Sequence, residues 1–291
     1  MRIHVLGTGA LACFFGARLA RAAEVTLIGT WTEGIDAIAR GGIVLETPGT
    51  EEAFAATAVR LGTPLEAGDL VLVLVKAWQT GRVAREVPAL TAPRGHVLTL
   101  QNGLGNAEKL GPRAFLGVTE QGATLVAPGR VRPCGDGPTH IAGPDSLAAV
   151  FRSAGLDARA VDPARGVSLA WGKLAANAGI NALSAILGVP NGKLLERPEA
   201  LPLLEAAANE VADVARAKVI ALPFPDAAAE ARRVARATAS NRSSMLQDVL
   251  RGAPTEIDAI NGAVVREGAR LGVPTPANET LLRLVAARAA A

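Results

Sequence analysis

The sequence contains few residues that could hold a metal ion or form disulfides. It has two cysteines, Cys13 and Cys134, and three histidines that lie far apart along the chain. Zinc sites need several such ligands at short, regular spacings, which this chain does not offer. We therefore expect no metal centre. Cys13 falls in a helix that should pack on a sheet, which favours a small buried hydrophobic role, and a disulfide to Cys134 is the alternative.

Long apolar runs and blocks of like charge are also missing. The longest apolar stretch, residues 174–190, contains two asparagines and is shorter than the ~20 residues that a membrane span needs. The 30 lysines and arginines are interspersed with 27 acidic residues, for a net charge of +3, which does not favour nucleic-acid binding. Glycines interrupt the apolar N-terminus, so we expect no signal peptide. These features predict a cytoplasmic protein that binds neither membranes nor nucleic acid.

The remaining composition is that of a folded protein with two domains. The chain has 291 residues, of which 49% are hydrophobic and 20% are charged, enough material for two moderate cores. Strand-forming runs dominate the first half, whereas alanine, leucine, glutamate and arginine dominate after residue 166. We predict a dinucleotide-binding domain over residues 1–165 and a helical domain over residues 166–291, with a linker at residues 163–166.

The first domain opens with a glycine motif. A β-rich run at residues 2–6 precedes it, a helical stretch follows, and a second strand is expected at residues 24–29. The motif consists of Gly7, Thr8, Gly9, Ala10, Leu11 and Ala12. Gly7 permits the tight turn, and Gly9 lets the backbone approach a pyrophosphate at the helix N-terminus. This order of strand, glycine turn, helix and strand predicts dinucleotide binding.

The end of the second strand bears on the choice of cofactor. An acid there binds the adenine ribose of NAD, whereas a nearby basic residue accommodates the 2′-phosphate of NADP. This chain has Thr30 at that point, which is neither. Arg18 and Arg40 are near in sequence, but nothing in the sequence shows that either reaches the phosphate. The preference between the two cofactors stays open.

Polar residues follow two further predicted strands, at residues 70–75 and 97–100. Both strands are almost continuously apolar, as strands buried on both faces of a parallel sheet are. Lys76 follows the first strand and Asn102 the second. Because ligands bind at the carboxyl ends of parallel strands, both are candidate site residues; the alternatives are a surface lysine and a turn asparagine. A β-rich stretch at residues 118–143 is expected to complete this sheet.

The second domain contains an isolated charge. Lys173 is the one charged residue between Arg165 and Lys193, and Asn177 and Asn181 follow it at spacings of four. On a helix these three side chains project from one face. Burying a lone charge costs several kcal/mol unless a partner or ligand compensates it, so the pattern predicts a polar site. The alternative is a lysine that extends to solvent beside two tolerated asparagines.

Further polar residues lie downstream in the helical half. Ser243 and Ser244 precede an apolar run, and Glu256 begins another. A serine at such a position could cap a helix, and an acid in a first turn could favour the helix dipole. These roles are purely structural.

Taken together, the motifs resemble the ketopantoate reductases, also called 2-dehydropantoate 2-reductases. The resemblance spans almost the whole chain and rests on the glycine motif, Val75-Lys76, Gln101-Asn102-Gly103, the Lys173, Asn177 and Asn181 line, Pro190-Asn191-Gly192, residues 243–248 and residues 256–258. It implies an α/β protein with an N-terminal Rossmann-type doubly wound sheet followed by an all-helical C-terminal domain, a 6-phosphogluconate dehydrogenase-like fold. It also implies an active site in the cleft between the two domains.

The resemblance implies roles for individual residues. Lys173 is similar to the general acid that protonates the substrate carbonyl as hydride arrives from a nicotinamide, and Glu256 to a residue that positions the substrate. Beyond the glycine motif, the implied cofactor contacts are Thr30, Lys76, Asn102 and Ala123. The implied substrate contacts are Asn102, Asn177, Asn181, Asn191, Ser244 and Glu256, with Asp248 as a further partner that orients them.

Two departures from the family pattern bear on specificity. Thr30 stands where many members carry an arginine for the 2′-phosphate, so NADP is the implied cofactor while NAD stays possible. Gln121 lies in a segment where relatives often place histidine, which could alter the substrate pocket. Neither departure touches Lys173.

The implied activity is reduction of 2-dehydropantoate to pantoate in pantothenate and coenzyme A biosynthesis. The alternatives are a related reductase of another 2-oxo acid, an opine-type dehydrogenase, and a redox sensor that binds dinucleotide without turnover. Lys173 and Glu256 disfavour the sensor, since it needs no proton donor. A homodimer is expected because dimers are the commonest assembly.

Overall fold

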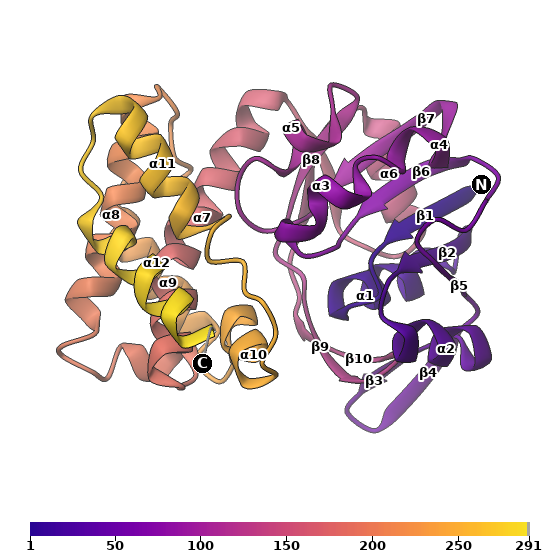
Figure 1. Ribbon diagram of the computed structural model, residues 1–291, viewed down its shortest axis with the longest axis horizontal. Helices are drawn as coiled ribbons and strands as arrows, with labels where there is room; N and C mark the ends of the chain where they lie inside the picture. Colours follow the sequence, from indigo (N-terminus) through magenta and orange to yellow (C-terminus); the bar gives the residue numbers. More distant parts are fainter. Residues whose placement is uncertain (290–291) are drawn as a thin grey trace. The chain divides into compact units, whose positions relative to one another are not determined.

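The computed structural model describes residues 1–289, which form two compact units (Figure 1). The first unit comprises Met1–Gln101 and Asn106–Gly166. The second comprises the chain from Val167 onward together with the short segment Asn102–Gly105. That segment belongs by its contacts to the helical unit, although the first unit surrounds it in sequence.

The first unit is built on an eight-stranded sheet with the order β12-β11-β8-β7-β6-β1-β2-β5. Neighbouring strands are parallel except β8 and β11, which are antiparallel. The strands are β1 (Arg2–Leu6), β2 (Glu24–Gly29), β5 (Thr57–Arg60), β6 (Gly68–Val73), β7 (Thr91–Thr99), β8 (Ala114–Thr119), β11 (Thr139–Ala142) and β12 (Ala158–Val161). The Rossmann-type sheet predicted from the sequence is confirmed. The chain leaves β1 toward β2 on one side and returns to β6 on the other, so the strand order reverses between β1 and β6, where such sheets bind ligands.

Helices connect the strands of this sheet. They are α1 (Ala10–Leu19), α2 (Thr32–Gly41), the 3-10 turn η1 (Ala77–Gln79), α3 (Thr80–Val83), α4 (Val87–Leu90), α5 (Asn106–Leu110) and α6 (Asp145–Ser153). Helix α1 is unusual because it is buried on almost every side, with Ala12, Cys13, Phe14, Phe15, Gly16, Ala17 and Leu19 all buried. A helix covered on one face by a sheet would show a polar outer face. Something else must therefore cover the outer face of α1.

A second, four-stranded sheet covers that face. It consists of β3 (Ile43–Thr47), β4 (Thr50–Phe54), β9 (Gly122–Ala127) and β10 (Arg130–Gly135), in the order β4-β3-β10-β9. Helix α1 contacts β3, β9 and β10, and lies between them and the main sheet (Figure 1). The prediction that residues 118–143 complete the main sheet is therefore wrong for β9 and β10. These strands pair with each other and with β3 because they cover the apolar outer side of α1.

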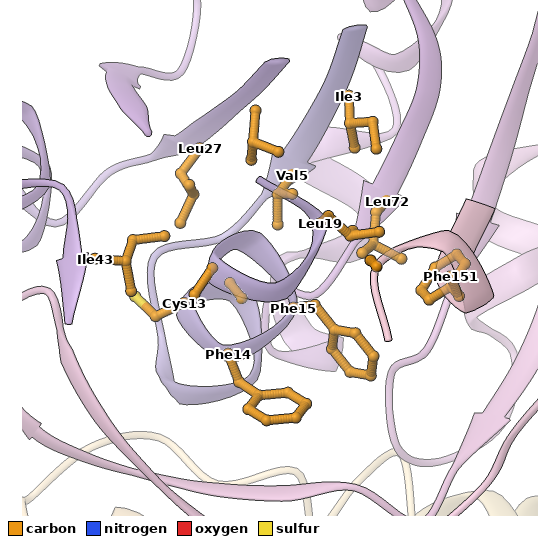
Figure 2. Packing of buried hydrophobic residues seen from close by; sticks show 14 of the residues in the cluster. Ile3, Val5, Cys13, Phe14, Phe15, Leu19, Leu27, Ile43, Leu72 and Phe151 are labelled. Atoms are coloured by element: carbon orange, nitrogen blue, oxygen red, sulfur yellow. The ribbon is translucent and has the colours of Figure 1, made fainter. Parts of the chain in front are cut away.

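The core around α1 is closely packed. Figure 2 shows Cys13 of α1 close to Ile43 of β3, with Leu27 of β2 on the same side. A Cβ atom at Gly16 would lie 3.1 Å from Ile43 Cδ1 and 3.2 Å from Leu27 Cδ1, so the helix approaches both sheets where it has no side chain. Contacts on both sides leave α1 little freedom to move.

The regular elements of the second unit, among its described residues, are all helices, joined by turns and loops. Its helices are α7 (Pro163–Leu187), which begins in the first unit, the 3-10 turn η2 (Asn191–Leu194), α8 (Leu201–Ala217), α9 (Ala227–Ala237), α10 (Ser244–Leu250), α11 (Asn261–Leu271) and α12 (Pro276–Ala289). The linker that the sequence predicts at residues 163–166 is instead the first turn of α7. Proline suits the first position of a helix, and the Asp162 carboxylate caps it by accepting a hydrogen bond from the Arg165 amide at 2.8 Å.

A buried polar network joins four helices of this unit. Asn261 of α11 donates to the Ala178 carbonyl of α7 at 2.9 Å and to the Asn278 side-chain oxygen of α12 at 3.0 Å. Asn278 donates in turn to the Glu210 carboxylate of α8 at 2.7 Å. The side-chain nitrogens of both asparagines are thus satisfied, whereas Asn261 Oδ1 is buried and accepts no hydrogen bond. Buried hydrogen bonds of this kind favour one packing over others. The network fixes α7 relative to α8, α11 and α12.

Two features are absent from the described residues 1–289. None of the helices there combines the length and the apolar character needed to cross a lipid bilayer. No set of three or more histidine, cysteine, aspartate or glutamate side chains in that range lies together in a way that could hold a metal ion. The histidines are spread over separate strands, with His4 on β1, His96 on β7 and His140 on β11.

The packing of α1 can be tested through its cysteine. Cys13 is completely buried, Cys134 is exposed, and no disulfide joins them. Burial raises the pKa of the Cys13 thiol to about 12, so its reactive thiolate is scarce at pH 8. We expect a thiol reagent at pH 8 to modify one cysteine in the native protein and two after denaturation. The control variant Cys134→Ser should show none in the native state, and native modification of Cys13 would contradict the packing.

Candidate functional site

Gly7 brings the loop after β1 into contact with the loop after β6 and with the end of β2. It lies directly after β1 with φ +133°, and a Cβ atom there would lie 3.0 Å from the Leu74 carbonyl oxygen and 3.2 Å from the Val75 nitrogen. Its amide donates to the Ile28 carbonyl of β2 at 2.8 Å. Only glycine adopts this conformation without strain and allows this approach. Gly7 therefore permits the turn, as predicted. It also lets the chain after β1 contact the chain after β6, where the strand order reverses.

The N-terminus of α1 opens onto free space. Gly9 is the N-cap residue, and no side chain caps the helix there. A Cβ atom at Gly9 would meet no heavy atom within 4 Å, so the position is open rather than packed. Helix N-termini stabilise anions through their unpaired amides and their dipole. This end of α1 has both the space and the charge distribution to bind a phosphate group.

The other residues of the glycine motif have distinct positions. Ala10 and Leu11 are half-buried, whereas Thr8 and Ala12 are buried. The side chain of Thr8 lies against β2, where a Cβ atom at Gly29 would come within 2.8 Å of Thr8 Cγ2. Gly29 thus leaves room for Thr8. Ala12 packs in the hydrophobic core and holds the helix in place.

The carboxyl end of β2 carries hydroxyl groups and a neighbouring arginine. Thr30 is exposed and Thr32 begins α2. Arg60, the last residue of β5, is paired in register with Gly29 of β2 and donates to Thr32 Oγ1 at 3.0 Å. The sequence did not single out Arg60 because β5 is short and was not predicted. The short run of residues 57–61, which contains the strand-forming Thr57 and Val59, was the available signal.

Gln101 joins the ends of β6 and β7. Its side-chain amide donates to the Val75 carbonyl at 2.7 Å and to Thr80 Oγ1 at 2.9 Å, and its oxygen accepts from Thr99 Oγ1 at 2.9 Å. Lys76, which is half-buried, directly follows Val75 and is the N-cap residue of η1. Gln101 therefore fixes the backbone beside Lys76, a structural role that the sequence does not predict.

Asn102 belongs to the helical unit. Gly103 beside it has φ +84°, and a Cβ atom there would lie 2.5 Å from the Ala259 carbonyl oxygen. That same oxygen accepts a hydrogen bond from the Leu104 amide at 3.0 Å. Ala259 is in the turn that begins at Glu256, where the Glu256 carbonyl accepts from the amides of Ala259 and Ile260. The segment of Asn102 is therefore held against the turn that contains Glu256, which is itself buried.

Helix α7 carries the predicted polar line. In residues 171–185 every residue is buried except Lys173 and Asn177, which are half-buried. Asn181 follows on the same helix with 6% of its surface exposed. The spacing of four residues places the three side chains on one face. Access to this part of α7 is thus limited to the face that bears the ammonium and the first amide.

The two adjacent serines before α10 have different positions. Ser243 caps the helix by accepting from the Leu246 amide at 3.1 Å, and it also accepts from the buried Ser184 Oγ of α7 at 2.6 Å. Ser244 is half-buried at the first position of α10 and caps nothing. Asp248 is buried one turn further on. The hydroxyl of Ser243 is thus engaged in hydrogen bonds within the protein, and Ser244 is the serine available for a ligand.

Asn191 combines a structural contact with an unused acceptor. Its side-chain nitrogen donates to Thr238 Oγ1 at 2.9 Å, and its backbone nitrogen donates to the Asn241 carbonyl at 3.0 Å. These bonds attach η2 to the end of α9. Its Oδ1 atom is buried and accepts no hydrogen bond. A buried acceptor without a donor is costly, which suits a position completed by a ligand.

Gln121 and Ala123 lie near the start of β9. The buried Gln121 donates to the Gly137 carbonyl at 2.5 Å and to Asp136 Oδ1 at 3.4 Å, so it holds the connection between β10 and β11. Ala123 is half-buried and packs against the core of the first unit. The predicted cofactor contact of Ala123 stays a prediction.

The two predicted sets of residues divide between the units. The first unit contains the glycine motif, Thr30, Lys76 and Ala123. The helical unit contains Asn102, Lys173, Asn177, Asn181, Asn191, Ser244 and Glu256. Asn102, which the resemblance assigns to both cofactor and substrate, thus lies with the substrate set.

This arrangement defines a Rossmann-type α/β protein with a glycine turn at an uncapped helix N-terminus and a helical unit bearing a lysine and several amides. Family models make the assignment specific: the one described as "Ketopantoate reductase PanE/ApbA" matches residues 3–145, and the one for its C-terminal part matches residues 167–289. The chain belongs to the ketopantoate reductase family.

Individual relatives agree with this membership. The chain is 36% identical to a 2-dehydropantoate 2-reductase of Archaeoglobus fulgidus, covering 98% of this chain and 96% of that protein. It is also 36% identical to one of Halobacterium salinarum, covering 98% of each. Among solved structures, a PanE/ApbA family ketopantoate reductase from Ralstonia eutropha is 36% identical with a TM-score of 0.90, covering 100% of this chain and 99% of that one.

One similar structure bears a different name. A D-mandelate dehydrogenase, solved with NADH and anilino(oxo)acetate, has a TM-score of 0.93 and 29% identity, covering 100% of this chain and 99% of that one. The fold is therefore shared by proteins that are named for different substrates.

The two serines before α10 provide a matched test of the site. We expect Ser243→Ala to lower the free energy of unfolding by about 1–2 kcal/mol, since it removes both the helix cap and the acceptor for Ser184. Ser244→Ala, one residue away, should leave stability almost unchanged. Denaturant unfolding of both variants measures the difference. Equal losses would contradict the distinction between the two side chains.

Proposed function

We propose that the protein catalyses the NAD(P)H-dependent reduction of 2-dehydropantoate to pantoate. The observation that carries the proposal is the face of α7, where Lys173 and Asn177 are the accessible residues of an otherwise buried stretch. Membership of the ketopantoate reductase family and the names of the relatives support the substrate. The reaction would serve pantothenate and coenzyme A biosynthesis. The cytoplasmic location and the homodimer stay predictions.

The first unit fits a nicotinamide dinucleotide. Gly9 offers open space where a side chain would otherwise block a pyrophosphate, and the uncapped N-terminus of α1 supplies backbone amides for it. The D-mandelate dehydrogenase of the same fold was solved with NADH, which is consistent with this class of cofactor. When bound, the nicotinamide would supply the hydride. The residues of this chain would bind and orient the substrate and protonate its carbonyl oxygen.

Lys173 is the proposed general acid. When hydride adds to a ketone, negative charge develops on the carbonyl oxygen. An ammonium at Lys173 Nζ stabilises that charge and donates the proton that completes the alcohol; such proton transfer typically contributes ~10² to 10⁴ in rate. The buried residues around Lys173, including Trp171 and Leu174, lower the local polarity and strengthen the effect.

The amides and the serine of the helical unit suit a substrate with carboxylate and hydroxyl groups. Asn177, Asn181 and Ser244 offer donors for the carboxylate, and the unused Oδ1 of Asn191 offers an acceptor for the hydroxyl. Glu256, buried in the turn beside Asn102, would position the substrate by accepting from a hydroxyl, with Asp248 as a further orienting group. An amide-rich site of this kind favours a hydroxylated 2-oxo acid over an aromatic one.

A second candidate is reduction of another 2-oxo acid. The structural likeness to the D-mandelate dehydrogenase favours it, because that protein has the same fold. An aryl 2-oxo acid would need an apolar pocket in place of hydroxyl contacts. The two candidates share Lys173 and differ in substrate selection.

Steady-state kinetics separate these candidates. The assay follows reduced nicotinamide at 340 nm with 2-dehydropantoate and with phenylglyoxylate, the 2-oxo acid that corresponds to mandelate. We expect a higher kcat/KM for 2-dehydropantoate. A preference for phenylglyoxylate would favour the second candidate, and turnover that requires an added amine would indicate an opine-type dehydrogenase. Tight cofactor binding without turnover of any 2-oxo acid would indicate a sensor.

Replacing Lys173 tests the proposed acid. We expect Lys173→Ala to lower kcat by about 10²-fold or more while cofactor affinity changes little, because the proton donor is lost and the dinucleotide contacts remain. Lys193→Ala is the matched control, since that lysine is exposed and pairs with Glu196 at 2.7 Å. Circular dichroism checks that both variants fold. A kcat near that of the wild type for Lys173→Ala would refute the assignment.

A further inference from the structure

The residue that distinguishes NADP from NAD must act at the carboxyl end of β2. Thr30 there has no charge to offer a 2′-phosphate, and it has no carboxylate to bind a 2′-hydroxyl. A basic side chain that binds a 2′-phosphate would therefore have to reach this point from elsewhere in the fold. Three arginines in or beside the first βαβ unit are candidates: Arg18, Arg40 and Arg60.

The positions of Arg18 and Arg40 exclude both. Each lies in the last turn of its helix, α1 or α2. These helices begin at the carboxyl ends of the strands. They rise about 1.5 Å per residue toward the amino ends of the strands. Arg40 accordingly lines a groove with Glu24 and Val25, which start β2, and Arg18 lies over the ring of Phe14, at 5.8 Å from its centroid.

Lys76 is also placed elsewhere. It follows β6, and β1 separates β6 from β2 in the sheet. Neighbouring strands lie about 4.8 Å apart, so β6 and β2 are about 10 Å apart. Lys76 is therefore closer to the switch point between β1 and β6 than to the end of β2.

Of these four basic residues, only Arg60 lies beside the carboxyl end of β2. It ends β5, which is parallel to β2 and in register, with Arg60 opposite Gly29. The bond from the Leu61 amide to the Gly29 carbonyl, at 2.8 Å, continues the pairing to the end of the strands. The guanidinium then reaches across to the loop after β2 and donates to Thr32 Oγ1 at 3.0 Å.

The surroundings of Arg60 leave its charge available. The side chain is exposed, and within the described part of the chain no carboxylate pairs with it. The ring of Trp31 packs against Gly34 of α2, where a Cβ atom would lie 2.3 Å from the ring, and does not cap that helix. Glu33, in the first turn of α2, directly follows Thr32 in the sequence. The loop thus presents two threonines and a guanidinium.

We propose that Arg60, held by Thr32 across the ends of β5 and β2, binds the adenosine 2′-phosphate and selects NADP over NAD. This inference rests on the proposed use of a nicotinamide dinucleotide. Guanidinium binds phosphate through several charge-assisted hydrogen bonds. Arg60 would supply, from the adjacent strand, the charge that Thr30 does not carry.

The test compares binding of 2′,5′-ADP and of 5′-ADP to the full-length protein by calorimetry, so it needs no turnover. The wild type should bind 2′,5′-ADP more tightly. Arg60→Gln should weaken 2′,5′-ADP binding by about 10- to 100-fold while 5′-ADP binding stays unchanged. Arg60→Lys should retain part of the preference, because it keeps the charge but not the fork geometry.

Arg40→Gln is the matched control, since it removes the same charge from an exposed position near the amino end of β2. It should leave both affinities unchanged. Equal binding of the two nucleotides by the wild type, or equal effects of Arg60→Gln on both, would overturn the proposal. Neither result would bear on 2-dehydropantoate reduction, which the kinetic assay at 340 nm tests independently.

Discussion

The burial of α1 between two sheets is the constraint on which the rest of the first unit depends. Seven of its ten residues are buried, so the helix packs against the main sheet on one side and β3, β9 and β10 on the other. A helix confined in this way presents its N-terminal amides at a fixed place beside β1. Anion binding at a helix N-terminus needs that fixed geometry, because the interaction weakens beyond the first turn.

Close backbone approaches at glycine then place the chemically important loops. Gly7 allows the loops after β1 and β6 to touch, and Gly103 allows the Asn102 segment to lie against the Ala259 carbonyl. Both glycines have positive φ, so other residues would be strained there as well as crowded. The same device therefore assembles the glycine turn of the first unit and, in the helical unit, brings the segment of Asn102 to the turn of Glu256.

Adjacent polar residues divide structural and chemical tasks. Ser243 caps α10 while Ser244 does not, and Gln101 ties two strand ends while Asn102 joins the helical unit. A structural neighbour with satisfied hydrogen bonds fixes the backbone, so the next side chain has a defined position at little further entropic cost. Sequence alone could identify the pairs but could not assign the tasks, because the partners are distant in the chain.

The sequence by itself determined the features that depend on local pattern. The βαβ unit, the helical second half and the line of Lys173, Asn177 and Asn181 follow from periodicity and from glycine at a turn. Tertiary structure alone decided which sheet β9 and β10 join and that Arg60 reaches the end of β2. Those outcomes depend on pairing between segments far apart in sequence, which local propensity does not encode.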